Sequence, residues 1–230
     1  MRNNNWFRAE IQETGPVKLW LYGEIVGSDG EKWGYDDVCP SDVAKALEQA
    51  NGRDLDIYIN SPGGDVFAGL AICARLSQYP GKKTAHVDGV AASIASIIPM
   101  VCDEVFIPEN AYLMVHKAWC IARGNADDLR KTVEMLDKAD GSIRNFYLQK
   151  LNPDKEEELS DRIEAESWMD GKETVGFFPS FQLESPVKLA ACADLKEVCG
   201  KQGWKVPEGY AEPTEDAELL KESLLLEMEL

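Results

Sequence analysis

Gly89-Val90-Ala91-Ala92-Ser93-Ile94-Ala95-Ser96 is the stretch around which the rest of this sequence is organised. Before it, Lys83–Asp88 has the pattern of a short β-strand that ends at Gly89. After it, Ile94–Val101 is apolar and favours a buried helix. A serine at such a turn projects its hydroxyl group, and the N–H groups at a helix start stabilise negative charge. The simpler interpretation is a small-residue helix that packs closely on a neighbour. The octapeptide alone fits both.

Three further segments favour a nucleophile. Ile57–Asp65 is a strand that runs into a Pro-Gly-Gly turn and opens a helix. Tyr112–His116 is a strand with a histidine at its end, and Glu164–Met169 places carboxylates just ahead of a tryptophan. A nucleophile, a glycine backbone donor, a base and an acid are the parts of a serine hydrolase.

In order and spacing, these segments resemble the family of Clp protease proteolytic subunits (ClpP), and more closely its phage head-maturation (prohead) relatives. The matching stretches are Ile59-Asn60-Ser61-Pro62-Gly63-Gly64, Gly89-x-Ala91-Ala92-Ser93, Met114-Val115-His116, and Glu166-x-Trp168-Met169 followed by Glu173. The resemblance covers about residues 17–178. It implies an α/β fold of the ClpP and crotonase type, built from repeated βαβ units. The alternation of strand and helix patterns also indicates a mainly parallel sheet.

The resemblance implies a catalytic triad. Ser93 matches the nucleophile and His116 the general base, whereas His86 lies mid-strand at a non-catalytic position and Ser96 matches no catalytic position. The orienting acid falls on Glu166, where the Clp protease itself has aspartate. Glutamate reaches one methylene further and can still accept the imidazole N–H group. Glu166 is therefore the predicted third member.

Other carboxylates near this position have simpler interpretations. Asp161 and Glu164 are expected to be solvated charges on a short helix. Asp170 is expected to be the N-cap of the following helix.

The resemblance also implies how a peptide is held. The backbone N–H groups of Gly64 and Ile94 match the oxyanion donors. Glycine is expected at position 64 because the backbone must approach the substrate without a Cβ. Gly63, Asp65 and Val66 match the region where the peptide pairs as an added β-strand. A tight Pro-Gly-Gly turn alone would be compatible with this role.

The sequence divides into three predicted parts. Residues 1–16 form an arm, residues 17–180 a ClpP-like protease domain, and residues 181–230 a C-terminal extension that is helical or partly disordered. Within the extension, residues 187–198 favour a helix, residues 200–213 a linker, and residues 215–230 an acidic, leucine-rich tail.

The expected elements follow from local patterns. Strands are predicted at Val17–Ile25, Leu55–Asn60, Lys83–Asp88, Glu104–Ile107 and Tyr112–His116, and helices at Ser41–Ala50 with Ser41 as N-cap, Asp65–Tyr79, Asn125–Lys150 and Lys155–Ala165. The helix from Asn125 carries an apolar stripe, and the resemblance implies that it is a handle through which subunits or rings associate.

Composition excludes several classes of function. A net charge of −17 argues against binding nucleic acid through its phosphates. The two histidines and six scattered cysteines give no metal-ligand spacing, so no metal or cofactor is predicted. Cys73 and Cys102 are expected to be reduced core residues. No apolar run is long enough to span a membrane, and the N-terminus lacks an apolar signal core, so a cytoplasmic protein is predicted, in the host cell if the gene is phage-borne.

These features predict a serine endopeptidase that acts as a homo-oligomeric ring, such as a heptamer or stacked rings. Its predicted substrates are scaffold or capsid proteins of a maturing phage head. An alternative is a subunit that works with a Clp ATPase in general protein degradation. A second alternative is an inactive scaffold homologue. A crotonase-type enzyme acting on acyl-CoA shares the architecture but does not need a Ser-His pair at these positions.

Overall fold

The computed structural model describes residues 8–12, 14–33, 37–186, 199–200 and 203–206. The predicted helix at 187–198, the tail at 215–230 and most of the arm at 1–16 lie outside these residues. In the described part of the chain, no helix is long and apolar enough to cross a membrane.

The described residues form one sheet of eight strands. The strands are β1 (Arg8–Glu10), β2 (Val17–Ile25), β3 (Leu55–Gly64), β4 (Lys83–Ala92), β5 (Glu104–Pro108), β6 (Tyr112–Val115), β7 (Ser167–Asp170) and β8 (Phe181–Glu184). The main order is β1-β2-β3-β4-β5-β8, and β6 pairs with both β4 and β7. Strands β2 to β5 are parallel, whereas β1 and β7 pair antiparallel with their neighbours.

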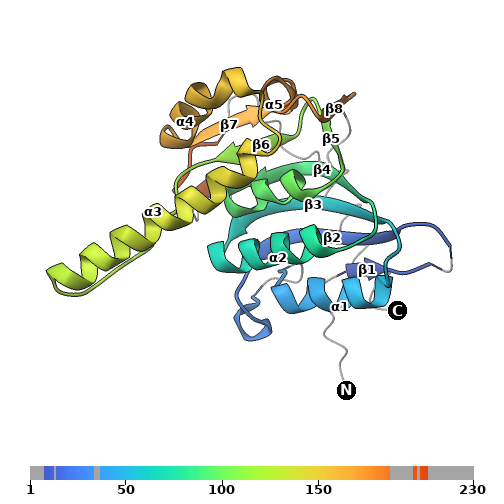
Figure 1. Cartoon of the computed structure of the whole chain (residues 1–230), viewed down its shortest axis with the longest axis horizontal. Helices are drawn as coiled ribbons and strands as arrows, with labels where there is room; N and C mark the ends of the chain where they lie inside the picture. Colours follow the sequence, from blue (N-terminus) through green and yellow to red (C-terminus); the bar gives the residue numbers. More distant parts are fainter. Residues whose placement is uncertain (1–7, 13, 34–36, 187–198, 201–202, 207–230) are drawn as a thin grey trace.

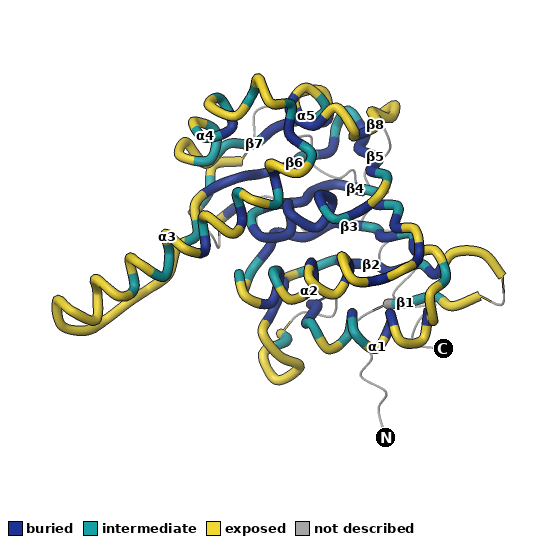
Figure 2. The backbone as a smooth tube through the Cα atoms, in the orientation of Figure 1, coloured by how far each residue is buried: buried dark blue, intermediate teal, exposed yellow. Residues whose placement is uncertain are grey.

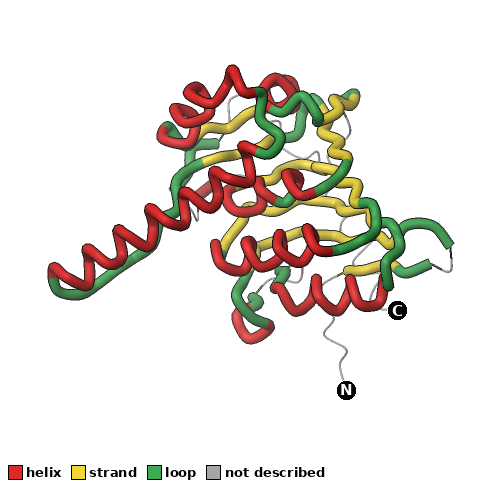
Figure 3. Tube along the Cα trace, viewed as in Figure 1, coloured by secondary structure: helices red, strands yellow, loops and turns green. Residues whose placement is uncertain are grey.

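Helices connect the parallel strands. They are α1 (Pro40–Ala50), α2 (Val66–Gln78), α3 (Ala126–Leu148), α4 (Glu156–Glu164) and α5 (Gly171–Phe177), with short 3₁₀ turns η1 (Asp29–Glu31), η2 (Ser93–Ile97), η3 (Pro99–Val101) and η4 (Pro153–Lys155). In Figures 1 and 3, α1 and α2 lie together on one face of the sheet. The units β2-α1-β3 and β3-α2-β4 are parallel βαβ units, which confirms the predicted α/β fold.

Alternating side chains divide the two faces of the sheet. Leu19, Ile57 and Val87 are fully buried on the helix-covered side, and the central strands form the buried core seen in Figure 2. The opposite face carries a row of stacked rings across β2 to β5, with centroid separations of 5.3, 4.9 and 5.3 Å: Trp20, Tyr58, His86 and Phe106. Cys73 and Cys102 are buried and free, as predicted.

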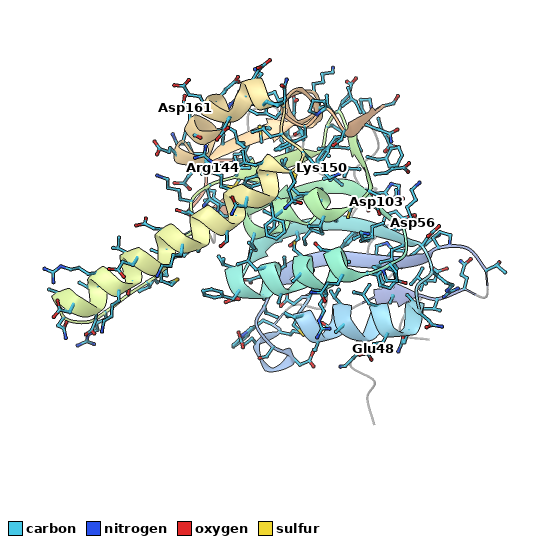
Figure 4. All side chains as sticks on the ribbon, viewed as in Figure 1. Glu48, Asp56, Asp103, Arg144, Lys150 and Asp161 are labelled. Carbon is cyan, nitrogen blue, oxygen red and sulfur yellow. The ribbon has the colours of Figure 1, made fainter. Side chains whose placement is uncertain are left out.

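Helix α3 is divided between core and solvent. Ile143 and Tyr147 are buried at its C-terminal end, whereas Leu129 and Val133 near its N-terminal end are 43% and 57% exposed. Its outer half projects away from the sheet, with the preceding loop running beside it (Figures 1 and 2). Its base is fixed to α4 by an ion pair of 2.8 Å between Arg144, labelled in Figure 4, and Glu156. The helix therefore protrudes as expected of a handle.

Two helix starts differ in how well they were predicted. The N-cap of α1 is Cys39 rather than Ser41, because Pro40 occupies the first helical turn and Asp42 accepts the Cys39 N–H group at 2.9 Å. The prediction of Ser41 was wrong. Asn125 caps α3, as predicted, by accepting from the N–H groups of Asp127 and Asp128.

The segment that follows the nucleophile is also different from the prediction. Strand β4 continues past Gly89 to Ala92, because its last residues pair with β6. The predicted helix at 94–101 is two short 3₁₀ turns, η2 and η3. Pro99 lies inside this segment and lacks an N–H group, so a continuous α-helical hydrogen-bond ladder is not available there.

The sheet extends past residue 180. Strand β8 pairs in parallel with β5, with Phe181 opposite Val105. The sequence analysis placed these residues in the C-terminal extension because Pro179 and Ser180 follow the last matched helix. Its first four residues after position 180 therefore belong to the sheet, not to a helix.

Candidate active site

Sheet register brings Ser93 and His116 together. Strands β4 and β6 pair in parallel, with Ala92 opposite Met114, so the residues just beyond both strand ends are neighbours. Ser93 Oγ lies 2.6 Å from His116 Nε2. Ser93 has φ of 53°, a left-handed conformation that non-glycine residues seldom adopt. The chain therefore turns sharply at the serine and directs its hydroxyl group at the imidazole.

Burial controls the charge of His116. Its side chain is 5% exposed. Burial lowers the pKa of the imidazole below its ordinary value, while the carboxylates of Glu166 and Asp140 act in the opposite direction. A lowered pKa keeps the ring neutral near pH 7, and a neutral ring can accept a proton from a hydroxyl group.

Glu166 lies on the other side of the imidazole. Its Oε2 atom is 3.9 Å from His116 Nδ1, and its side chain is 60% exposed. This distance is longer than a hydrogen bond. The residue lies in the turn between α4 and β7, where its φ is 50°. The structure thus brings the predicted acid beside the ring without a direct hydrogen bond.

The neighbouring carboxylates have other partners. Glu164 Oε1 lies 2.9 Å from Lys117 Nζ at the surface. Asp170 accepts the Glu173 N–H group at 2.8 Å and is the N-cap of α5, as predicted. Ser96 is fully buried, donates to the Ser93 carbonyl at 2.5 Å and lies 2.6 Å from the Tyr147 hydroxyl group. These residues have structural roles in the described part of the chain.

Gly63 and Gly64 allow β3 to approach its neighbours closely. A Cβ atom at Gly63 would lie 2.7 Å from Ser93 Cβ and 3.1 Å from the Ile94 nitrogen. A Cβ at Gly64 would lie 2.1 Å from the Ile25 carbonyl oxygen. The sequence analysis attributed Gly64 to the approach of substrate, but its constraint comes from β2. Gly63 brings the end of β3 against the Ser93–Ile94 peptide.

A cavity of about 220 Å³ contains the serine and the histidine. Its lining residues are Glu24, Pro62, Gly64, Val66, Ser93, His116, Ala118, Trp119 and Trp204. Val66 therefore reaches the cavity, as the sequence analysis expected of a residue that contacts substrate. The Asp65 carboxylate instead accepts the Ala68 N–H group at 2.7 Å and caps α2. A larger hollow of about 490 Å³ near α1 and α2 contains none of the predicted site residues.

The sequence analysis missed Trp204. This residue lies in a stretch that was interpreted as a linker, yet its ring centroid is 5.3 Å from that of His116. A single tryptophan in a Gly- and Pro-containing stretch gives no local signal of such a contact.

One cluster resembles a metal site by composition alone. Within the described residues, side-chain atoms of Asp29, Cys39 and Asp42 lie within 4.8 Å of one another. The Lys32 ammonium group lies among them, 2.9 Å from Asp29 and 2.6 Å from Asp42. A lysine cation therefore already neutralises these carboxylates, and the cluster stabilises the loop before α1.

Comparisons with known proteins agree with this fold. The family model for Clp protease matches residues 37–177, which is more than half of the chain. The ATP-dependent Clp protease proteolytic subunit of Streptococcus mutans is 30% identical over 156 residues, 62% of this chain and 76% of the relative. The subunit of the same name from Lactococcus lactis subsp. cremoris is also 30% identical over 156 residues, 62% of this chain and 74% of the relative. Members of this family are peptidases that act on protein substrates as oligomeric rings, and the match shows that this chain belongs to the Clp protease family.

Proposed function

We propose that this chain is a serine endopeptidase in which Ser93 is the nucleophile, His116 the general base and Glu166 the orienting acid. The distance of 2.6 Å between Ser93 Oγ and His116 Nε2 carries the proposal. A hydroxyl group becomes an effective nucleophile when a base lies within hydrogen-bond reach. The burial of His116, which lowers its pKa, keeps the base unprotonated near neutral pH.

The reaction is acyl transfer to the serine and then to water. Ser93 Oγ attacks the peptide carbonyl carbon while His116 Nε2 takes the hydroxyl proton. The N–H groups of Gly64 and Ile94 are proposed to stabilise the resulting oxyanion. His116 then gives its proton to the leaving amine, and the carbon–nitrogen bond breaks. A water molecule, deprotonated by His116, releases the acyl group and restores Ser93.

Glu166 is proposed to act on the charge and orientation of the imidazole. Its carboxylate stabilises the imidazolium that forms when His116 takes the serine proton. At 3.9 Å, rotation of the exposed glutamate side chain is needed for a hydrogen bond to Nδ1. Bound peptide that excludes water from this side of the ring would favour the shorter contact.

Covalent labelling tests the proposal. Purified wild-type protein is incubated with a fluorophosphonate probe, and the modified residue is identified by mass spectrometry. We expect labelling on Ser93 that is lost in Ser93→Ala and in His116→Ala, because both remove the activated nucleophile. His86→Phe is the matched control, since a ring at position 86 can keep the stack between Tyr58 and Phe106.

Absence of wild-type labelling in the assembled protein would contradict the proposal and favour an inactive scaffold homologue. Labelling that persists in Ser93→Ala would identify a different nucleophile. Equal loss in His86→Phe and His116→Ala would mean that the loss reflects folding rather than chemistry.

The outer half of α3 supports the proposed homo-oligomer. Leu129 and Val133 are apolar and exposed on the protruding helix, and burial between copies would stabilise an assembly. Native mass spectrometry of wild type and Val133→Asp tests this: the substitution should lower the oligomeric fraction without unfolding the protein. An unchanged distribution would place the interface elsewhere.

The proposed biological setting is head maturation of a phage, with scaffold or capsid proteins as substrates. Its support is the resemblance of Glu166-x-Trp168 and of the helix start at Asn125 to phage-type sequences. The names of the related proteins fit the alternative equally well, namely a subunit that works with a Clp ATPase. Cleavage of a long protein without an added ATPase supports the first setting, whereas cleavage of short peptides alone supports the second.

A further inference from the structure

The chain returns to the candidate active site after the end of the family match. The match ends at residue 177, and Cys199 lies 22 residues further along the sequence. Cys199 is 1% exposed and packs with Val90, Ala92 and Met114, which belong to β4 and β6. These are the two strands that end at Ser93 and His116. The segment is therefore anchored on the strands that carry the candidate catalytic pair.

A tight turn carries Trp204 from this anchor into the site. The Trp204 N–H group donates to the Cys199 carbonyl at 2.8 Å. Gly203 has φ of 72°, a conformation that glycine adopts without strain. The Trp204 ring lines the cavity of about 220 Å³ together with Ser93. An indole at this place is thus a wall of the site.

Trp204 makes two edge-to-face ring contacts. Its centroid lies 5.3 Å from that of His116 at an interplanar angle of 80°. It also lies 6.0 Å from the Trp168 ring at 74°. Such arrangements are attractive because the positive edge of one ring meets the negative face of another. Trp168 thereby holds the indole against the imidazole.

The imidazole has few other supports for its orientation. Ser93 fixes one ring nitrogen through the 2.6 Å contact. The Glu166 carboxylate is 3.9 Å from the other nitrogen and mostly exposed, so it does not fix the ring by a hydrogen bond. Packing against Trp204 is the contact that restricts rotation of the ring plane and covers it from water.

We propose that Trp204 is a positioning residue, which holds the His116 imidazole toward Ser93 and shields it from solvent. The inference rests on the proposed function, because it assigns Trp204 a task within the same Ser-His pair. It also gives the segment around Cys199 a role in activity, although this segment lies outside the matched family region.

Shielding gives the proposal a pH signature. The groups that act on His116 are the Ser93 hydroxyl from η2, Glu166 from the turn before β7, and Asp140 from α3. The two carboxylates raise its pKa, and burial lowers it by a larger amount. The indole contributes no charge. Removing the indole reduces burial, so the His116 pKa rises and the acid limb of the activity profile moves to higher pH.

The experiment compares Trp204→Ala, Trp204→Phe and wild type in the full chain. The probe is diisopropyl fluorophosphate, which is small enough to report on the nucleophile rather than on extended peptide binding. We expect Trp204→Ala to slow labelling of Ser93 by about 10- to 100-fold, as for a modest misplacement of a reacting group. Trp204→Phe should recover most of the rate, because it keeps a ring edge against His116.

Three further readouts distinguish positioning from a general structural effect. With a peptide substrate, kcat should fall more than KM in Trp204→Ala. The acid limb should move upward in Trp204→Ala but not in Trp204→Phe. Trp33→Phe is the matched control, since Trp33 is 93% exposed and should label at the wild-type rate.

Several results would overturn the inference. Unchanged labelling in Trp204→Ala would remove the positioning role, and faster labelling would show that the segment is an inhibitory cover. A rise in KM with unchanged kcat would make Trp204 a substrate contact only. Each of these leaves wild-type labelling, and hence the proposed function, intact. A wild type that is not labelled at all would instead overturn the proposed function, and the inference with it.

Discussion

The two sides of His116 are built in different ways. On one side, Ser93 is held at 2.6 Å by the register of two buried strands. On the other side, Glu166 lies at 3.9 Å on a connecting turn, with 60% of its side chain exposed. The sheet therefore fixes the nucleophile and the base, whereas the acid depends on a side chain that solvent can reach. We expect substitutions on the serine side to have larger effects than substitutions on the glutamate side.

The largest effect is expected from the serine–histidine pair itself. Ser93→Ala and His116→Ala should each lower kcat by about 10⁴-fold or more, because neither residue activates a hydroxyl group alone. The double variant should be no slower than either single variant. Steady-state cleavage of a fluorogenic peptide measures all three, with thermal unfolding as the control for folding. Multiplicative losses in the double variant would mean that the two residues act independently.

Gly63→Ala should have the next largest effect. The added Cβ would lie 2.7 Å from both Ser93 Cβ and the Ala92 carbonyl oxygen, and φ at this position is 91°. Either β3 or the serine turn must move, which should lower kcat by about 100-fold. Gly141→Ala in α3 is the matched control, because a Cβ at that position meets no atom within 4 Å.

The two glycine variants should also differ in stability. Gly141→Ala should raise the free energy of unfolding by about 0.5–1 kcal/mol, as expected of an exposed helix interior. Gly63→Ala should lower it, because the new contact involves backbone atoms that cannot rotate away. Urea denaturation measures both. Equal stability of the two variants would show that the end of β3 relaxes freely, contrary to the buried geometry of the serine side.

Local sequence signals predicted the serine side well. The bounds of β2 were predicted from alternation, and the N-caps Asn125 and Asp170 from their side chains. These features depend on neighbours within a few residues along the chain. The placement of Ser93 beside His116 followed instead from motifs that matched a family, because the register of β4 and β6 has no local signal.

Long-range packing explains what the sequence did not predict. Strand β8 forms because β5 offers a free edge, and the contact of Trp204 with His116 depends on where Cys199 is anchored. The side chain of Glu166 was identified correctly as the nearest predicted acid, but its separation of 3.9 Å from the ring depends on the turn between α4 and β7. Its role as the third triad member stays a prediction.

Glu166→Gln should have a moderate effect. We expect kcat to fall by about 10- to 100-fold, less than for the serine side, because the carboxylate is exposed and not hydrogen-bonded to the ring. The negative charge of Glu166 raises the pKa of His116. Its removal therefore lowers that pKa further, and the neutral, active form of the base persists to lower pH.

The acid limb of the kcat/KM profile should accordingly move to lower pH in Glu166→Gln. Glu166→Asp is the matched control, because it keeps the charge and should retain a limb closer to that of wild type. A shift to higher pH in Glu166→Gln would contradict the electrostatic role. A loss of 10⁴-fold or more, as large as that expected for His116→Ala, would show that the glutamate is as firmly built into the site as the serine.

The smallest effect is expected from Glu164, the carboxylate two residues before Glu166. Its side chain is 67% exposed and pairs with Lys117 Nζ at 2.9 Å. Exposed ion pairs of this kind contribute little, because water and salt screen both charges. Glu164→Gln should change kcat by less than about twofold and should not move the acid limb. Because Glu164 and Glu166 have the same functional group, peptide cleavage by the two glutamine variants under identical conditions isolates position from charge. A larger loss in Glu164→Gln than in Glu166→Gln would transfer the orienting role to Glu164 and reverse the assignment of the exposed side of His116.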